Sequence, residues 1–311
     1  MRIVTESEVR DALDPAMLIS GLEYAFGTLG DHVVRMPPRS CVELADGAVV
    51  ISMPCFDESH GAGVKLVSIS REAGVQATYL LLDPTTGAVT AVIPANDLTD
   101  LRTAAASALA TDQLARSGAR VLGIFGTGRL ARAHVRLLPL VRNFELILVC
   151  GSSPAKSSAF AQELLRAGLQ AEAVGPESLA AAADVICTCT TSTTPVLRGA
   201  WIRPGTHINA VGAYLPGNRE LDTEAVRHAR VIVDTYDGAL AEAGDLLLPL
   251  AEGAISREHI AADLHEVISC KKNGRTSDEQ VTLFKSVGCA LEDLAAAQLL
   301  VATLESEQGA T

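Results

Sequence analysis

The sequence predicts an α/β fold in which a doubly wound parallel sheet is joined to a smaller α+β module. Two patterns predict it. From position 121 onward, short apolar runs alternate with helical segments, as in parallel sheets with right-handed crossovers. Between Met36 and Val92, several strand-like runs instead follow one another directly, which favours an antiparallel sheet over a βαβ unit. We therefore expect two structural domains.

The first module is predicted to begin as a helix and to continue as strands. Residues 2–30 carry apolar side chains at helical spacing, and Thr5 can cap this helix with Glu8 completing a capping box. Gly27 and Gly30 would end the helix. Further along, the patterns predict strands at 39–44, 49–53, 63–69 and 76–82, a turn at 83–87 that leads to another short strand, and a helix at 97–115.

The second module follows the turn at Ser117-Gly118, and its elements alternate in order. The predicted strands are 121–125, 145–150, 184–189, 207–211 and 230–234, and the predicted helices are 129–140, 155–167, 177–182 and 222–228. From Gly238 we expect helix and loop, and then a final helix at about 279–304 that packs back on the first module. The domains expected are therefore 1–117 together with about 282–311, for substrate binding and dimerisation, and 118–281, for nucleotide binding.

The glycine-rich stretch 126–130, Gly-Thr-Gly-Arg-Leu, lies where the first of the parallel strands turns into a helix. Gly126 permits the tight turn, Gly128 lets the backbone approach a pyrophosphate, and Ala131 lets helix and strand pack closely. The helix N-terminus attracts phosphate charge. We expect Gly126, Thr127, Gly128, Arg129 and Leu130 to contact a dinucleotide in a Rossmann domain, although a merely tight turn would use the same glycines.

The end of the next predicted strand decides between NAD and NADP. NAD enzymes usually carry an acidic residue there for the ribose 2′-hydroxyl. This chain instead has Ser152, Ser153 and Lys156, which can bind a 2′-phosphate, so we favour NADP(H) and keep NAD(H) possible. The alternative is a helix capped by Ser153 with Lys156 in solvent. At the end of a further strand, Thr188 and Thr190 are placed where the cofactor crosses the sheet, unless they only form a polar turn.

Three cations stand out in the first module. Arg39 lies at the start of a predicted strand, Lys65 lies within one, and Arg102 opens a largely apolar helix. An unpaired lysine in an apolar strand would be costly to bury. The residues can therefore form internal salt bridges or extend to solvent, or they can clamp a substrate carboxylate, with arginine bidentate and Lys65 polarising or protonating the substrate.

The composition excludes several classes of protein. The chain of 311 residues has a net charge of −12, which disfavours binding to nucleic acid or to anionic membranes, and 48% of its residues are hydrophobic. We find no signal peptide and no apolar run long enough for a membrane span. The seven cysteines lack metal-ligand spacing, so we expect reduced thiols, no metal site and a cytoplasmic location.

The sequence resembles the ornithine cyclodeaminase/μ-crystallin family over nearly its whole length. The motifs that carry the resemblance are G-V-K-L-V-S (63–68), L-L-D-P-T-T-G (81–87), L-T-D-L-R-T-A-A-A-S-A-L-A (98–110), G-T-G-R-L-A-R-A-H (126–134), N-A-V-G-A-Y-L-P-G-N-R-E-L-D (209–222), A-L-A-E-A-G-D-L (239–246) and F-K-S-V-G-C-A-L-E-D-L-A-A-A (284–297). The resemblance implies a homodimer built through the N-terminal sheet, and a Rossmann domain. It makes Arg39, Lys65 and Arg102 the candidate substrate-binding and catalytic cations.

The resemblance also implies the chemistry, which is hydride transfer between an amino acid's α-carbon and a nicotinamide. Within the shared motifs we expect further cofactor contacts from Asn209, Val211, Gly212, Ser286 and Val287. We expect the chain to reduce a small α-imino acid, or to aminate an α-keto acid reductively, as an imine reductase or amino-acid dehydrogenase.

One position departs from the family pattern. Ornithine cyclodeaminases carry an aspartate where this chain has Tyr214. A phenol, with a reference pKa near ~10, is neutral and does not anchor a second ammonium in the same way. Tyr214 therefore argues against a lyase that recycles NAD internally, and we consider it a possible hydrogen-bond donor in the catalytic site. A nicotinamide-binding, crystallin-like protein without turnover is the remaining alternative.

Overall fold

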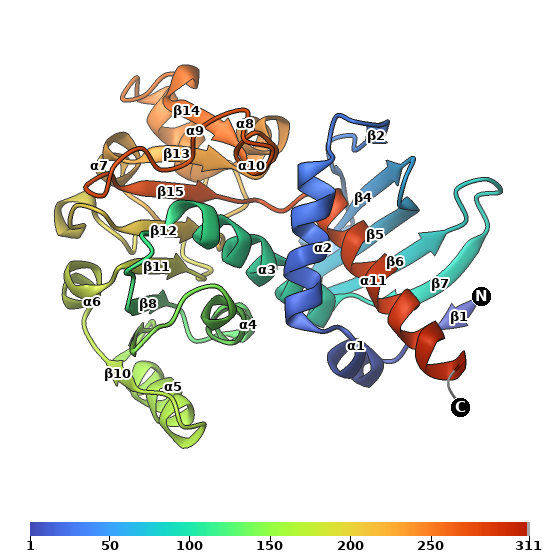
Figure 1. Cartoon of the computed structure of the whole chain (residues 1–311), viewed down its shortest axis with the longest axis horizontal. Helices are drawn as coiled ribbons and strands as arrows, with labels where there is room; N and C mark the ends of the chain where they lie inside the picture. Colours follow the sequence, from blue (N-terminus) through green and yellow to red (C-terminus); the bar gives the residue numbers. More distant parts are fainter. Residues whose placement is uncertain (310–311) are drawn as a thin grey trace. The chain divides into compact units, whose positions relative to one another are not determined.

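The computed structural model describes residues 1–309, which form two compact units (Figure 1). Of the described residues, one unit contains 1–106 and 289–309, and the other contains 107–288. The sequence placed these boundaries at 117/118 and at about 282. The first boundary instead falls inside a helix, and the second follows a strand that the sequence analysis did not predict.

The N-terminal part of the first unit contains two helices where the sequence predicted one. The predicted capping box is confirmed, because Thr5 Oγ1 accepts from Glu8 N while Glu8 accepts from Thr5 N. The break arises at Asp14, whose carboxylate caps a second helix with Pro15 as its first residue. The helices are α1 (Glu6–Ala12) and α2 (Pro15–Gly27).

The sheet of this unit is antiparallel apart from one edge strand. Its strands are β1 (Arg2–Ile3), β2 (Val34–Arg35), β3 (Ser40–Glu43), β4 (Val49–Asp57), β5 (Gly61–Ser70), β6 (Gly74–Leu82) and β7 (Val89–Pro94). They are ordered β1-β7-β6-β5-β4-β2, with β3 also pairing with β4 and β1 parallel to β7. Alternate residues of β4 and β5 are buried, so one face of the sheet is the covered face.

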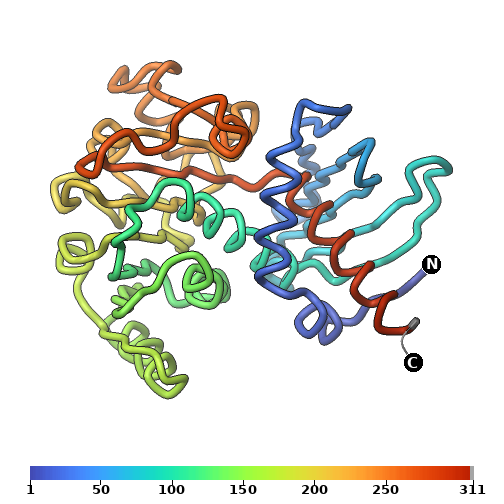
Figure 2. Tube along the Cα trace, viewed as in Figure 1, coloured from blue at the N-terminus to red at the C-terminus, as the bar shows by residue number. Residues whose placement is uncertain are grey.

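The C-terminal helix covers that face. Helix α11 (Ala290–Gly309) packs against α2 and against β4 and β5. In Figure 2 the red end of the chain crosses the blue and cyan strands, so the unit is built from both ends of the sequence. The strand register places Met53, Lys65, Tyr79 and Ile93 in one row on the buried face.

The second unit contains a sheet of parallel strands. The strands are β8 (Val121–Phe125), β9 (Leu146–Cys150), β10 (Ala171–Ala173), β11 (Val185–Thr188), β12 (His207–Ala210), β13 (Arg230–Val233), β14 (Ile260–Asp263) and β15 (Thr282–Lys285). Their order is β10-β9-β8-β11-β12-β15-β13-β14, and every pairing is parallel. The predicted doubly wound parallel sheet is confirmed. The strand order reverses between β8 and β11, which is where ligands bind in such sheets.

The helices connect these strands (Figure 1). They are α3 (Asn96–Leu114), which the boundary between the units divides, and α4 (Arg129–Leu137), α5 (Pro154–Arg166), α6 (Pro176–Ala182), α7 (Thr223–His228), α8 (Tyr236–Glu242), α9 (Gly244–Ala251) and α10 (Leu264–Ile268). Short 3-10 helices lie at 45–47, 138–140, 199–201 and 257–259. Among the described residues, none of the helices combines the length and apolar character that a membrane span needs.

Two strands correct the sequence analysis, which expected only helix and loop after Gly238. Strand β14 is at the edge of the sheet, and β15 lies inside it between β12 and β13. The final helix was predicted from 279 but begins at Ala290. The strand β15 is a four-residue segment that ends in a lysine, so its own sequence gives little sign of a buried strand, and its burial comes from pairing with β12 and β13, which are distant in the sequence.

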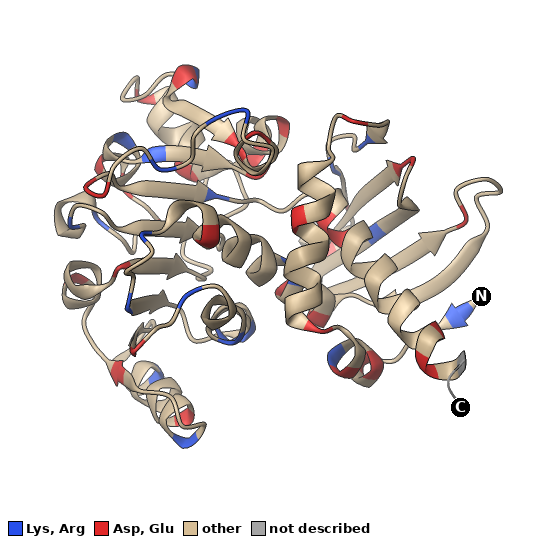
Figure 3. Ribbon diagram, in the orientation of Figure 1, with Lys and Arg blue, Asp and Glu red and all other residues tan. Residues whose placement is uncertain are grey.

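Charged residues of both signs are interspersed in each unit (Figure 3). Four charged residues described below, Lys65, Arg102, Glu292 and Asp293, are buried.

Candidate functional site

A cavity of about 980 Å³ opens at the carboxyl ends of the strands where the parallel sheet reverses its order. Its volume is at the upper end of the range for ligand pockets, about 300–1,000 Å³. The predicted cofactor residues that line it are Gly126, Thr127, Gly128, Ser152, Lys156 and Thr190. They come from the ends of β8, β9 and β11 and from the start of α5.

The two glycines of the turn differ in what surrounds them. Gly126 has φ +111°, and a Cβ there would lie 2.5 Å from the Cys189 carbonyl oxygen, so only glycine fits. A Cβ on Gly128 would meet nothing within 4 Å. Gly128 caps α4 without any side-chain hydrogen bond, so the helix start faces open space. The start of a helix, with its unpaired backbone N–H groups, is where phosphate groups bind in such folds, and no side chain occupies this position.

Arg132 fixes the turn from the helix side, and the sequence analysis missed it. Its Nη1 donates to the carbonyl oxygens of Thr127 (2.5 Å) and Gly128 (3.2 Å). The guanidinium also binds both carboxylate oxygens of Glu163, at 2.9 and 2.6 Å, and lies 4.7 Å from the centroid of Phe160. All three residues line the cavity. The signal in the sequence was an arginine one turn after the glycines.

Helix α5 follows β9 and is capped by Ser153, which is the alternative that we gave for this segment. Ser153 Oγ accepts from Lys156 N at 3.3 Å, and Ser153 is not among the cavity-lining residues. Lys156 Nζ donates to Ser152 Oγ at 3.3 Å, and both line the cavity. Two of the three residues predicted to bind a 2′-phosphate are therefore together at one wall.

The remaining wall comes from the segment after β11. Arg198 lies over the indole of Trp201, 5.3 Å from the ring centroid, and both line the cavity. Neither residue was predicted from the sequence, because neither belongs to a recognisable motif. An aromatic face and a guanidinium suit a flat, anionic ligand.

Several predicted cofactor residues lie outside the cavity lining. They are Arg129, Leu130, Ser153, Thr188, Asn209, Val211, Gly212, Ser286 and Val287. Most occupy the carboxyl ends of β11, β12 and β15, at the same edge of the sheet. Asn209 is directed into the interior, where its Nδ2 donates to Thr111 Oγ1 at 2.9 Å.

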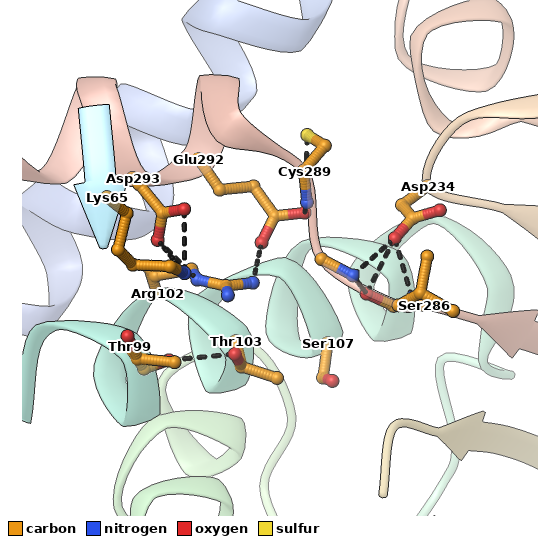
Figure 4. A network of polar contacts seen from close by, with 12 residues as sticks. Lys65, Thr99, Arg102, Thr103, Ser107, Asp234, Ser286, Cys289, Glu292 and Asp293 are labelled. Atoms are coloured by element: carbon orange, nitrogen blue, oxygen red, sulfur yellow. Dashed lines mark hydrogen bonds and ion pairs between the residues drawn. The ribbon is translucent and has the colours of Figure 1, made fainter. Parts of the chain in front are cut away.

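Two buried carboxylates hold those strand ends in place. Glu220 accepts from Thr188 Oγ1 at 2.9 Å, from Thr190 N at 2.7 Å and from Gly212 N at 2.7 Å, and burial raises its pKa. Asp234 Oδ2 accepts from Ser286 Oγ and from the backbone N–H groups of Val287 and Gly288 (Figure 4). The predicted residues Thr188, Gly212, Ser286 and Val287 are thus hydrogen-bonded to these carboxylates at the ends of their strands.

The first unit contains a buried network of charges (Figure 4). Lys65 Nζ lies 2.7 Å from Asp293 Oδ2 and donates to Oδ1 at 2.8 Å. Arg102 Nε donates to Asp293 Oδ1 at 2.9 Å, and its Nη1 donates to Glu292 Oε2 at 2.6 Å. The structure brings Lys65 and Arg102 together through two acids of α11 that the sequence analysis did not single out. The signal was the Glu-Asp pair at the start of an apolar helix.

The surroundings shift the protonation of both cations. Burial and the Arg102 cation lower the pKa of Lys65 to about 8, although Asp293 opposes this. Burial alone would lower the pKa of Arg102, but Asp293 and Glu292 raise it above its ordinary value. A lysine that titrates near neutrality inside a fixed ion-pair network can exchange a proton.

The other predicted catalytic residues are less buried. Arg39 lies between β2 and β3 and is partly buried. Tyr214 follows β12, is partly buried and packs against the core of the second unit. The sequence analysis also missed Tyr79, whose buried Oη has no hydrogen-bond partner within the described residues and which pairs with Lys65 across the sheet.

The chain is similar to known proteins over nearly its whole length. Ketimine reductase mu-crystallin of Mus musculus is 36% identical over 309 residues, covering 96% of this chain and 95% of that protein. The structure of Thermococcus litoralis Δ1-pyrroline-2-carboxylate reductase in complex with NADH and L-proline matches with a TM-score of 0.95 at 35% identity, covering 99% of this chain and 98% of that one.

An archaeal alanine dehydrogenase dimer with bound NAD matches with a TM-score of 0.93 at 30% identity, covering 99% of this chain and 97% of the other. The model of the ornithine cyclodeaminase/mu-crystallin family matches residues 1–308. This chain belongs to the ornithine cyclodeaminase/mu-crystallin family.

Proposed function

We propose that this protein reduces a small α-imino acid to an amino acid with hydride from NAD(P)H. The imine can be cyclic, or it can form from an α-keto acid and an amine. The observation that carries the proposal is the buried cation pair Lys65 and Arg102, in a chain that also has a glycine-lined cavity at the reversal of a parallel sheet. The relatives described above, a ketimine reductase and a pyrroline-2-carboxylate reductase, support this reaction class.

The cavity of the second unit fits the dinucleotide. The open side of Gly128 and the uncapped start of α4 suit the pyrophosphate. When bound, NAD(P)H supplies the hydride. Ser152 and Lys156 would bind a 2′-phosphate, so we propose NADP(H) as the preferred cofactor and NAD(H) as an alternative. Glu163 does not oppose this choice strongly, because Arg132 neutralises it.

The cations of the first unit would bind the substrate carboxylate. Arg102 bonds the two acids through Nε and Nη1, so we assign Nη2 to the carboxylate. Arg39 would add a second positive charge. Lys65, with its lowered pKa, would hold or move the proton that the imine nitrogen needs. Tyr214 would donate a hydrogen bond to the substrate.

We also propose a homodimer that forms through the sheet of the first unit. One face of this sheet is covered by α11, whereas Leu66, Val42 and Val75 are exposed large apolar side chains of its strands. Light scattering is expected to give twice the chain mass of 32.5 kDa. Replacing Leu66 with Glu should produce monomers, and a wild-type protein that is monomeric would refute this part of the proposal.

The reaction is tested by following cofactor oxidation with a panel of substrates. The panel contains pyrroline- and piperideine-carboxylates, and pyruvate, glyoxylate and oxaloacetate with and without ammonia or methylamine. Each is tested with NADH and with NADPH. We expect oxidation with at least one imine and a preference for NADPH. A protein that binds NADPH but reduces no member of the panel would favour a binding function without turnover.

A further inference from the structure

Two imidazole rings in the first unit are directed at one buried carboxylate. Asp57 is the last residue of β4, and its side chain is only 1% exposed. His32 Nε2 lies 2.8 Å from Asp57 Oδ1, and His60 Nδ1 lies 2.7 Å from Asp57 Oδ2. The three donor atoms lie within 4.8 Å of one another. None of these residues belongs to the charge network of Lys65 and Arg102.

The backbone holds this cluster in place. Val34 of β2 pairs with Asp57, which fixes the segment that carries His32 beside the end of β4. Asp57 Oδ1 accepts from the backbone N–H groups of Ser59 at 2.8 Å and His60 at 3.1 Å. These bonds orient the carboxylate independently of either ring, as hydrogen bonds around a metal site orient its ligands.

A hydrogen bond to Asp57 accounts for the position of only one of the two rings. His60 Nδ1 has hydrogen-bond geometry toward Asp57. His32 Nε2 is as close to the carboxylate, but it makes no hydrogen bond of acceptable geometry within the described residues, although it is buried. A buried ring nitrogen without such a bond is costly unless something else contacts it.

Nitrogen and carboxylate oxygen are ligands that zinc and similar divalent cations prefer. Three protein ligands with a fourth position for water form a common zinc geometry. The side chains of His32 and His60 are 14% and 23% exposed, so an ion can reach the site from solvent.

We propose that His32, Asp57 and His60 form a binding site for a divalent transition-metal cation of the zinc class. The ion would tie the segment after α2 to the turn between β4 and β5. The prediction that the chain has no metal site rested on cysteine spacing. It missed this cluster because His32 is distant in sequence from Asp57 and His60 and joins them only through the pairing of β2 with β4.

The test is a titration of the full-length, chelator-stripped protein with Zn²⁺ in competition with a chromogenic chelator. We expect saturation at one Zn²⁺ per chain, and at least about tenfold weaker binding in His32→Gln and in His60→Gln. His228→Gln is the matched control, because His228 is exposed and lies near a single carboxylate, Glu224, at 4.0 Å. Zn²⁺ should also raise the Tm of the wild type but not that of His32→Gln.

Three results would overturn the proposal. They are no binding by the wild-type protein, unchanged affinity in both histidine variants, and a loss of affinity in His228→Gln equal to theirs. If a variant does not fold, the wild-type protein loaded with Co²⁺ still decides the question. Its absorption spectrum should show nitrogen and oxygen ligation, and a thiolate charge-transfer band would assign the ion to cysteines instead.

Discussion

Lys65 of β5 and Asp293 of α11 form a buried ion pair with Nζ 2.7 Å from Oδ2, although 228 positions separate them in the sequence. The same carboxylate accepts from Arg102. Asp293 therefore fixes the position of the two cations that we propose to act on the substrate, and it connects the last helix of the chain to its first sheet.

Replacing Lys65 should lower kcat/KM strongly while the protein still folds. We expect Lys65→Met to lower kcat/KM by about 10²- to 10⁴-fold, the range for a lost acid–base group. Steady-state kinetics with the best imine substrate measure this effect, and circular dichroism controls for folding. A Lys65→Met enzyme with wild-type kcat/KM would refute the proposed role.

The same lysine should set an alkaline limit on the reaction. Its pKa is lowered to about 8, so as the pH rises through 8 Lys65 loses the proton and the positive charge that we propose the reduction uses. We expect kcat/KM to be constant below this value and to fall above it. In Lys65→Arg, any residual activity should not show this step, because arginine stays protonated. An unchanged step in the arginine variant would assign it to another group.

Asp293 should matter for stability because it neutralises buried cations. Asp293→Asn removes the negative charge that neutralises part of the positive charge of Lys65 and Arg102. Breaking a buried ion pair lowers the free energy of unfolding by about 3–5 kcal/mol. Urea unfolding measures this loss. Glu6→Gln is the control: it removes an exposed partner of Arg10 in the same unit, and its unfolding midpoint should match the wild type. Equal midpoints for both variants would contradict the burial argument.

The two glycines of the turn should respond differently to alanine. Gly126→Ala should destabilise the protein by more than about 1 kcal/mol, because φ is positive and Cβ meets a carbonyl oxygen. Gly128→Ala should fold normally but bind NADPH about tenfold or more weakly, because its Cβ enters the space that we assign to the pyrophosphate.

Gly118→Ala is the matched control, since a Cβ there also meets nothing within 4 Å. Thermal unfolding and fluorescence titration separate the two effects. Wild-type affinity in Gly128→Ala would place the phosphates elsewhere.

The features that the sequence predicted correctly depend on residues that are close together in the chain. Gly126 determines a turn by its own conformational freedom, with φ +111°, and Thr5 and Glu8 cap a helix through contacts three residues apart. The alternation of strands and helices predicted the parallel sheet for the same reason, because it follows from the period of the apolar residues.

The features that the sequence missed are formed by distant contacts. Strand β15 ends in Lys285, which is buried and whose Nζ lies 2.8 Å from Asp245 Oδ2 and donates to the Ala213 carbonyl oxygen. Asp293 and Glu292 look like ordinary helix-start acids until the sheet brings Lys65 and Arg102 to them. Arg132 was missed for the same reason, because its partner Glu163 is on the next helix of the same unit.

Lys156 should discriminate between the two cofactors. Lys156→Ala should lower kcat/KM with NADPH at least about tenfold, the value of one charge-assisted hydrogen bond, and change it little with NADH. Arg166→Ala, at the far end of the same helix α5, is the control. Equal losses with both cofactors would show that Lys156 does not contact a 2′-phosphate.

The most direct test of the proposed reaction follows the hydride itself. The enzyme is given NADPH with deuterium at both hydrogen positions of the nicotinamide C4, together with a cyclic α-imino acid, and the product is analysed by mass spectrometry. The account predicts an amino acid with one deuterium at its α-carbon and one NADPH consumed for each product. Cyclisation of ornithine with catalytic NAD⁺, ammonia release and no net consumption of reduced cofactor would contradict it.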